Sequence, residues 1–309
     1  MSKRVLVVGS INVDYVIHTD RLPVLGETLV GNGFSMNFGG KGANQAVALA
    51  KSGCDVKMLG AVGSDHAATL AIQNLESFGI DCTHVLHMDA PTGAAVITVC
   101  GGDNHIILDG GANDLLTPEV ILAHEALFDW ADVLVMQYEI PAASVLCAAQ
   151  LAKRKGKKVL LNPAPVKEVD PALYQCVDLI IPNEFETALI TGIEPTDEGS
   201  TCVALSEMRE LGCGIVVITL GSRGCAYSYD KEVRFAGTYP VEVVDTTAAG
   251  DSFVGGLCTK LCEGWELPRA IVYASAVSAI TVSRHGAGVS IPTAEEVEAF
   301  LRERGQTLD

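Results

Sequence analysis

The sequence lacks the excess of basic residues with which proteins hold polyanions. Its 309 residues include 21 lysines and arginines against 38 aspartates and glutamates, a formal net charge of −17. Without a positive field over its surface, the chain is not expected to bind nucleic acid or an anionic membrane, and a phosphate-bearing ligand would have to be held by local groups. Apolar residues make up 49% of the chain and charged residues 19%, so we expect a sizeable core and no extensive disorder.

Long hydrophobic runs and paired cysteine motifs are also missing. The N-terminal apolar run ends at Gly9, and the stretch 270–282 is too short for a bilayer and contains serine and threonine. Ten cysteines are scattered along the chain without a C-x-x-C pair, a pattern typical of small buried thiols in a reducing compartment. We therefore expect a soluble, cytoplasmic protein.

Two glycine signatures of nucleotide-binding proteins are absent. Only Gly9 follows the first apolar run, whereas the dinucleotide fingerprint needs three glycines at set spacing, which disfavours an NAD-dependent dehydrogenase. The segment Gly39-Gly40-Lys41-Gly42 lacks the earlier glycine of a P-loop, and Gly42 stands where that motif has serine or threonine.

Strand-like apolar runs alternate with helical patterns through most of the chain. The strands are expected at Val5–Val8, Val56–Leu59, Val133–Met136, Lys158–Leu161, Leu179–Ile181 and Ile215–Thr219. The helices are expected at about 43–52, 67–77, 118–127, 142–154 and 201–211, and the chain after Gly250 is mainly helical. This alternation predicts one α/β domain over residues 1–309, a three-layer αβα fold with a mostly parallel central sheet.

Two segments break the alternation, approximately 14–38 and 92–108. The first contains short alternating runs around Tyr15–His18 and Thr28–Val30, and the second has two runs joined by Gly101–Asn104, a hairpin signal. We expect these insertions to form a small sheet that stands off the main body. Such a sheet must cover its open face, which predicts a lid over an active site and contacts in a homodimer.

Polar residues follow several of the predicted strands, at the edge where ligands bind in open α/β sheets. Asn12 and Asp14 come after the first strand, and an amide with a carboxylate suits the hydroxyls of a polyol, although an ordinary Asx turn explains the pair equally well. Asn183 and Glu186 follow a later strand with the spacing of a helix capping box, and a carboxylate near phosphates also serves Mg²⁺ through water. The glycine-rich turn 219–224 is a candidate phosphate and nucleotide contact.

The segment 244–253 places small residues and a glycine directly before a helix. The amides of Ala249, Gly250 and Asp251 would be free donors at a positive helix end, which is an anion site. Asp251 in the first turn could accept a hydroxyl proton beside the bound anion, an arrangement suited to phosphoryl transfer to an alcohol. A capped helix start, with Asp251 complementing the helix dipole, is the alternative for this segment alone.

Over essentially its whole length the sequence resembles the ribokinase-like (PfkB) carbohydrate kinases. The resemblance is carried by Gly39–Ala46, with the sequence GGKGANQA, and by Asp245–Phe253, with the sequence DTTAAGDSF; Asn162–Pro165 points away from the nucleoside-kinase branches. It implies that ATP phosphorylates the primary 5-hydroxyl of D-ribose, giving D-ribose 5-phosphate and ADP. Kinases for 2-deoxyribose, fructose or a ribonucleoside, or a sugar-binding regulator without catalysis, remain alternatives.

The resemblance also implies a role for each matching residue. Asp251 would be the catalytic base, and the amides of Ala248, Ala249, Gly250 and Asp251 would stabilise the phosphoryl group. The sugar would be held, together with Asp251, by Asn12, Asp14, Gly40, Lys41, Asn44 and Glu139. ATP would be bound by Asn183, Thr219, Gly221, Ser222, Gly224, Gly250 and, at the adenine, Ser275. Glu186 would organise Mg²⁺ through water. An activating K⁺ would be held, mostly through backbone carbonyls, by Asp245, Thr247, Thr281, Arg284, Gly286 and Ser290.

Overall fold

The computed structural model describes residues 3–101 and 103–306, and a nine-stranded sheet forms its centre. The strand order is β13-β12-β11-β10-β9-β8-β1-β4-β5, and all pairings from β11 to β5 are parallel. The strands are β1 (Arg4–Val8), β4 (Asp55–Val62), β5 (Asp81–His87), β8 (Val133–Met136), β9 (Lys158–Leu161), β10 (Leu179–Ile180), β11 (Ile215–Thr219), β12 (Cys225–Tyr229) and β13 (Glu232–Ala236). Only β12 and β13, at one edge, run antiparallel to their neighbours.

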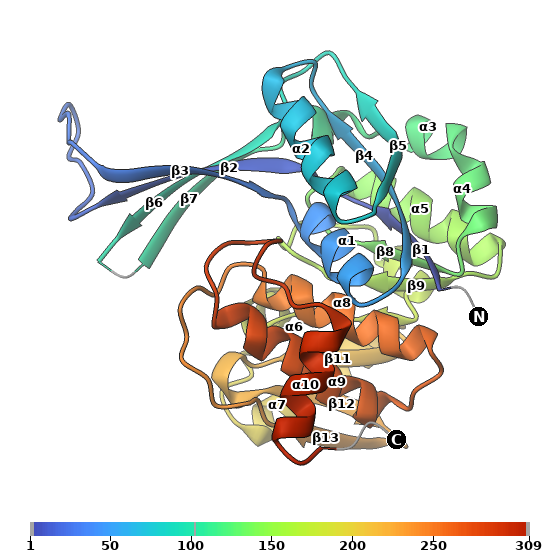
Figure 1. The fold of residues 1–309 in the computed structure, drawn as a ribbon. Coiled ribbons are helices and arrows are strands. Elements are labelled where there is room, and N and C mark those ends of the chain that lie inside the picture. Colours follow the sequence, from blue (N-terminus) through green and yellow to red (C-terminus); the bar gives the residue numbers. More distant parts are fainter. Residues whose placement is uncertain (1–2, 102, 307–309) are drawn as a thin grey trace.

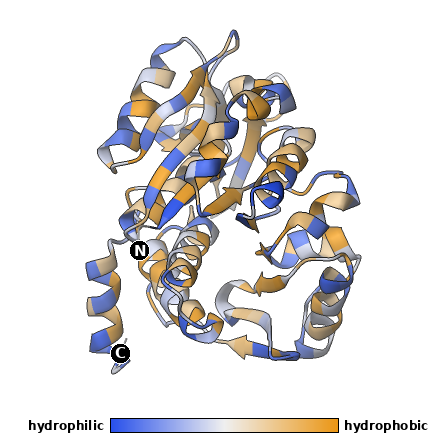
Figure 2. Cartoon of the chain, turned by 90° about the vertical axis from the view of Figure 1, so that its right-hand side faces the viewer, coloured by the Kyte–Doolittle hydropathy of each residue, from blue (hydrophilic) through white to orange (hydrophobic). Residues whose placement is uncertain are grey.

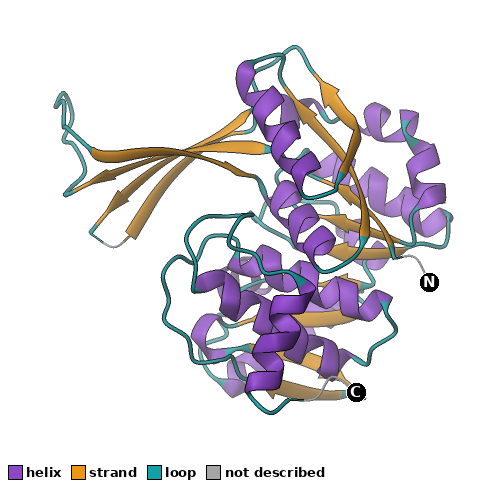
Figure 3. Cartoon of the chain, in the orientation of Figure 1, coloured by secondary structure: helices purple, strands orange, loops and turns teal. Residues whose placement is uncertain are grey.

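Helices cover both faces of this sheet (Figure 3). They are α1 (Lys41–Lys51), α2 (His66–Ser77), α3 (Pro118–Ala123), α4 (Glu125–Trp130), α5 (Ala142–Arg154), α6 (Glu184–Thr191), α7 (Glu198–Glu210), α8 (Ala249–Cys262), α9 (Leu267–Val282) and α10 (Ala294–Glu303). Short 3₁₀ segments lie at Gly111–Leu115, Pro171–Cys176 and Gly221–Arg223. Alternate residues of β1 belong to different cores: Val5 and Val7 lie in the cluster that includes residues of α1, α8 and α9, whereas Leu6 and Val8 lie in the cluster that includes residues of α5 and α7. This is the three-layer α/β fold that the sequence predicts.

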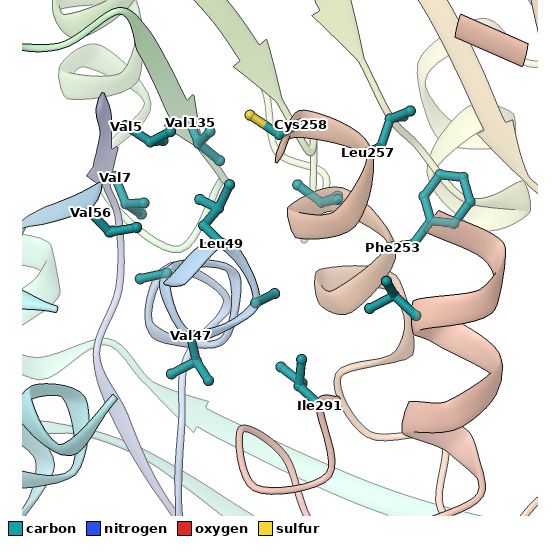
Figure 4. Packing of buried hydrophobic residues seen from close by; sticks show 14 of the residues in the cluster. Val5, Val7, Val47, Leu49, Val56, Val135, Phe253, Leu257, Cys258 and Ile291 are labelled. Atoms are coloured by element: carbon teal, nitrogen blue, oxygen red, sulfur yellow. The ribbon is translucent and has the colours of Figure 1, made fainter. Parts of the chain in front are cut away.

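The contact between α1 and α8 positions the site. Figure 4 shows Leu49 of α1 beside Val5, Val7 and Val135 of the sheet, with Cys258 on the side of α8 that faces them; all belong to one hydrophobic cluster. A Cβ atom on Gly255 would lie 2.3 Å from Cβ of Ala48, so the two helices approach as closely as a glycine permits. Because both helices begin at the same edge of the sheet, this contact holds their first turns together.

A second sheet of four strands, in the order β3-β2-β6-β7, projects from the body (Figure 1). Its strands are β2 (Asn12–Thr19), β3 (Asn32–Gly39), β6 (Gly93–Cys100) and β7 (Asp103–Asp109). The prediction of a strand at Thr28–Val30 is wrong: these residues are loop, and the strand that pairs with β2 begins at Asn32. Gly102, in the predicted hairpin turn, lies outside the described residues.

The other differences from the sequence-based expectation are local. The helix expected at 118–127 is two short helices that meet at His124, and β5, α6, β12 and β13 were not expected. Figure 2 shows hydrophobic residues recurring along the strands and their covering helices, as the apolar patterns indicate. In the part of the chain that the structure describes, every helix falls short of the length and apolarity that a membrane crossing needs.

Candidate active site

Four chain segments meet beyond the carboxyl ends of β1 and β8: residues 10–14, the start of α1, Glu139 and the start of α8. Oε2 of Glu139 joins residues 10–12 and the start of α1 to the segment that follows β8. It accepts hydrogen bonds from the hydroxyl of Ser10 at 2.6 Å, the backbone amide of Lys41 at 2.9 Å and Nδ2 of Asn12 at 3.4 Å. Charge-assisted bonds of this kind are stronger than neutral ones, so Glu139 fixes the start of α1 against residues 10–12.

Asn113 fixes the other side of Asn12. Its Nδ2 donates to Oδ1 of Asn12 at 2.8 Å, and its Oδ1 accepts from the amide of Ile11 at 3.0 Å. Asn113 is 1% exposed and Asn12 3%. Asn113 was not predicted as a site residue, because its only signal in the sequence is an asparagine in the glycine-containing segment after β7.

Asp14 is a buried carboxyl among other carboxyls. Its side chain faces the backbone of Gly39, where a Cβ atom would lie 2.3 Å from Oδ2 of Asp14. Burial, and then the charges of Glu139 and Asp251, raise the pKa of Asp14 to about 7. A proton therefore resides on Asp14 at pH values where an exposed aspartate is ionised.

The glycines around Lys41 serve the packing of the chain on itself. Gly40 has φ 89°, and a Cβ atom there would lie 2.8 Å from the amide nitrogen of Asn12. A Cβ atom on Gly42 would lie 2.5 Å from the nitrogen of Ser10. The small residues let α1 begin directly against residues 10–12, where the amide of Ala43 donates to the carbonyl of Ser10 at 2.9 Å.

Lys41 lies at the first position of α1, half-buried. Burial lowers the pKa of its ammonium, yet the net result lies above the ordinary value. The increase comes from three surrounding carboxylates, those of Asp251, Glu139 and Glu186. Lys41 is thus the cation among the acidic groups of the site.

Asp251 is buried in the first turn of α8, and both of its oxygens accept amide protons. Nδ2 of Asn44 donates to Oδ2 at 3.2 Å, and Nε2 of Gln45 donates to Oδ1 at 2.9 Å. Gln45 in turn contacts Gln137 and Asn162, and all three lie in the interior. None of these three was predicted as a site residue.

The start of α8 leaves backbone amides open. Ala248 has the left-handed φ of 60°, and the amide of Ser252 donates to its carbonyl at 2.8 Å. Within residues 3–101 and 103–306, no acceptor is bonded to the amides of Gly250 and Asp251, and Gly250 is exposed with open space where a Cβ atom would lie. The amide of Ala249 differs from the expectation, because it donates to the carbonyl of Thr246 at 3.2 Å.

The residues expected to bind ATP lie in several places. Asn183 and Glu186 form the capping box of α6: the amide of Glu186 donates to Oδ1 of Asn183, and the amide of Asn183 donates to Oε2 of Glu186, both at 2.8 Å. Thr219 pairs with Asn183 in a parallel bridge, so the turn with Gly221, Ser222 and Gly224 begins beside the cap. Ser275 lies in α9 and is 6% exposed.

Burial raises the pKa of Glu186 above its ordinary value, although the amide of Asn183 and the ammonium of Lys41 act in the opposite direction. Asp251 contributes further to the increase. These effects connect the cap of α6 electrostatically to the starts of α1 and α8.

The segments expected to hold a monovalent cation are joined by Asp245. Its carboxylate accepts from the amide of Thr247 at 2.9 Å and from the amide of Gly286 at 3.0 Å. The hydroxyls of Thr281 and Ser290 donate to nearby backbone carbonyls, and the side chain of Arg284 pairs with Glu296. In the described ranges, no three His, Cys, Asp or Glu side chains converge as metal ligands.

Known proteins resemble this chain in both sequence and fold. The sequence pattern of the pfkB family of carbohydrate kinases matches residues 2–294. The chain belongs to the pfkB family of carbohydrate kinases. The membership, the fold class and the enzyme class of ATP-dependent sugar kinase predicted from the sequence are thereby confirmed.

Curated and solved pfkB relatives match nearly the whole chain. A ribokinase of Haemophilus influenzae is 41% identical over 303 residues, which are 97% of this chain and 99% of that protein. A ribokinase of Staphylococcus aureus is 37% identical, covering 96% and 99%. The structure of an Arabidopsis thaliana ribokinase complexed with ribose and ATP is 30% identical, with a TM-score of 0.91 over 98% of this chain and 99% of that one.

Proposed function

We propose that this kinase transfers the γ-phosphoryl group of ATP to the primary 5-hydroxyl of D-ribose, giving D-ribose 5-phosphate and ADP. The observation that carries the proposal is the start of α8, where the buried carboxylate of Asp251 adjoins two open backbone amides. The similarity to ribokinases over nearly the full chain supports ribose as the sugar. A deoxyribokinase of Salmonella typhi is also 34% identical over 96% of this chain, so 2-deoxyribose is the second candidate.

Asp251 would act as the general base. In phosphoryl transfer the protein's main contributions are positioning and electrostatic stabilisation, with a base to take the proton of the attacking hydroxyl. The amides of Gly250 and Asp251, open at a positive helix end, would donate to the transferring phosphoryl group, together with the amide of Ala248. The amide of Ala249 would join this set only after its hydrogen bond to Thr246 is broken.

The sugar would lie among Asn12, Asp14, Gly40, Lys41, Asn44 and Glu139. The hydroxyls of a polyol both donate and accept hydrogen bonds. This set supplies carboxylate acceptors, side-chain amides that can donate and accept, and one ammonium donor. The raised pKa of Asp14 bears on affinity, because a sugar hydroxyl that donates to Asp14 favours the ionised carboxylate.

ATP would be held by Asn183, Thr219, Gly221, Ser222 and Gly224 at the end of β11, with Gly250 at the phosphates and Ser275 at the adenine. Glu186 fits a role in organising Mg²⁺ through water, since its two oxygens already bond Asn183 and direct ligation would break the cap of α6. When bound, Mg²⁺ neutralises charge on the transferring phosphates.

A K⁺ ion would be held by backbone carbonyls of Asp245, Thr247, Thr281, Arg284 and Gly286, with the hydroxyl of Ser290. Two observations support this ligand set. The carboxylate of Asp245 holds residues 245–247 beside Gly286, and the hydroxyl of Thr281 is bonded to another carbonyl, so backbone oxygens are the expected ligands. Carbonyl oxygens are suitable ligands for such a cation. The ion would act by shaping the loop before α8, and so the amides that it presents.

The projecting sheet would serve as a lid and as the contact of a homodimer. On one face the register aligns Met36, Tyr15, Val96 and Ile107 in a row across the four strands, with Phe34 beside it. Phe34 is 67% exposed and Ile107 74%. An apolar face of this kind is expected to be covered, and a second copy offers the same face. Light scattering of Ile107→Asp would show monomers where the unaltered chain forms dimers.

The proposed substrate is tested with a coupled ADP-release assay over ribose, 2-deoxyribose, fructose and ribonucleosides, with and without K⁺. We expect the highest kcat/KM with ribose in K⁺. A higher value with any other acceptor would reassign the substrate, and no sugar-dependent ADP release would refute the activity. We place the enzyme in the cytosol, because its ten cysteines are all free.

A further inference from the structure

A chain of side-chain amides runs through the interior behind Asp251. Asn162 donates from Nδ2 to the carbonyl of Ile181 at 2.8 Å and accepts at Oδ1 from Nε2 of Gln45 at 3.1 Å. Nε2 of Gln137 donates to Oε1 of Gln45 at 2.6 Å. Gln45 and Gln137 are 0% exposed and Asn162 8%, so the chain is shielded from solvent.

The orientation of every amide in this chain follows from Asp251. An ionised carboxylate only accepts hydrogen bonds, so Gln45 must present its NH₂ group to Oδ1 of Asp251. Its Oε1 then faces Gln137, which must present its own NH₂ group. This order leaves Oε1 of Gln137 without a bonded partner among the described residues, although the atom is buried.

The surrounding backbone maintains this arrangement despite its cost. A Cβ atom on Gly9 would lie 2.1 Å from Oε1 of Gln137, so the glycine at the end of β1 leaves the space that Gln137 fills. A buried acceptor without a partner costs about 1–3 kcal/mol, and such groups need an explanation. The explanation is that Gln137 must use its NH₂ group to hold Gln45, which in turn donates to Asp251.

We propose that Gln45, supported by Gln137 and Asn162, is a positioning residue that holds Oδ1 of Asp251 and leaves Oδ2 as the oxygen that takes the proton. The inference deepens the proposed function and rests on it. Oδ2 has the longer bond, 3.2 Å to Asn44, and Asn44 belongs to the proposed sugar pocket. In the transfer, the O–H bond of the sugar breaks and its proton goes to Oδ2. The sugar oxygen bonds to the γ-phosphorus, and the bond from that phosphorus to the ADP oxygen breaks.

An amide suits this task better than a cation. It holds the carboxylate by hydrogen bonds without adding a positive charge that would make the carboxylate a weaker base. After the proton transfer, Oδ1 is still an acceptor, so the amide chain keeps the same order in both states. Asp251 is thus held in one rotamer throughout the reaction.

The test compares Gln45→Met, Gln45→Glu and Gln137→Met in the full-length enzyme, with kcat and sugar KM measured from pH 5.5 to 9. For Gln45→Met we expect kcat to fall about 20-fold or more with sugar KM within about threefold, because the position of the base is lost and the pocket is kept. The acidic limb of its kcat profile should move to higher pH, since one donor to the carboxylate is gone. Gln137→Met keeps that donor and should lose less.

Gln45→Glu separates positioning from packing. While the introduced carboxyl is protonated it can donate to Oδ1 of Asp251, and once ionised it repels that oxygen. We therefore expect its kcat to fall as pH rises above the titration of the pair, the reverse of the unaltered enzyme. This variant also carries the test if Gln45→Met does not fold.

Thr259→Val is the matched control. It also removes a buried side-chain hydrogen bond, the one from the hydroxyl of Thr259 to the carbonyl of Gly255, but this bond lies beyond the first turn of α8. It should lower the midpoint of thermal unfolding without changing the pH profile. Unchanged kcat and pH profile in Gln45→Met, or the same altered profile in Thr259→Val, would overturn the inference. If the proposed function itself is wrong, the result is different: the unaltered enzyme releases no ADP in response to a sugar.

Discussion

Replacing Asp14 by asparagine should stabilise the protein at neutral and alkaline pH. In the native structure the pKa of Asp14 is raised to about 7 by burial and by Glu139 and Asp251, from an ordinary value of 3.8. Well below pH 3.8 the carboxyl is protonated in both the native and the unfolded state. As pH rises from 4 to 7 the unfolded chain ionises Asp14 while the native chain resists, so the native state loses stability across that window.

The magnitude follows from the separation of the two values. About three pH units at about 1.4 kcal/mol each give a ceiling of about 4 kcal/mol at pH 8. Asp14→Asn leaves no charge to bury, and Nδ2 of the introduced amide has the size of the oxygen that it replaces. The gain over the unaltered chain should therefore be smallest at pH 4 and largest at pH 8.

Urea unfolding of both proteins at pH 4, 6 and 8 measures this difference. Asp20→Asn, which removes an exposed carboxyl directly after β2, is the control and should give the same small difference at each pH. The gain should accompany a sugar KM higher by about 10- to 100-fold, because a charge-assisted hydrogen bond is lost. A gain that does not change with pH, or a variant less stable than the unaltered chain at pH 8, would refute the reasoning.

Three further predictions concern the helices around the site. Asp251→Asn should lower kcat by about 10²- to 10⁴-fold with sugar binding by calorimetry retained; normal turnover would exclude it as the base. Glu186→Gln keeps the length of the side chain that caps α6, so the midpoint of thermal unfolding should not change. The Mg²⁺ concentration for half-maximal rate should rise, because the charge is lost; an unchanged Mg²⁺ requirement counts against the role of Glu186. Gly255→Ala should lower the free energy of urea unfolding by about 1–3 kcal/mol and should also lower kcat, because it separates α8 from α1. Gly256→Ala, on the side of α8 that faces α9, is the control and should leave kcat unchanged. Equal kcat in the two variants would contradict this.

Local patterns predicted most of the central sheet. Apolar runs such as Val5–Val8 and Val133–Met136 are short, rich in valine and mostly buried, and they form strands at those positions. The prediction missed β13, whose residues are partly exposed at the edge of the sheet and so show no continuous apolar run. It also failed at Thr28–Val30, where a β-branched run lies in a loop because the register with β2 is set from Asn32 onward.

The site could be predicted only as separate groups. Asn12, Lys41 and Asp251 each stand in a local motif, and parallel strand ends bring such motifs to one edge. Gln45 and Gln137 were not assigned a role because they are 92 residues apart and each alone is an ordinary amide. The resemblance placed Gly40 in the sugar pocket, whereas in the structure Gly40 and Gly42 are required first by the chain's own approach to residues 10–12.

The charges of the site explain how so acidic a chain can hold ATP. Asp251, Glu139 and Glu186 surround one cation, Lys41, and the charges of Glu139 and Asp251 also act on Asp14, so all four carboxyls could not be ionised without strong repulsion. The proton on Asp14 removes one of these charges while the site is without sugar. The hydroxyls of a sugar can replace that proton as donors, and Mg²⁺ and open helix amides can meet the phosphates. Sugar binding should therefore release a proton near pH 7, and calorimetry in buffers of different ionisation enthalpy measures it; proton uptake would mean that Asp14 binds the sugar as a donor.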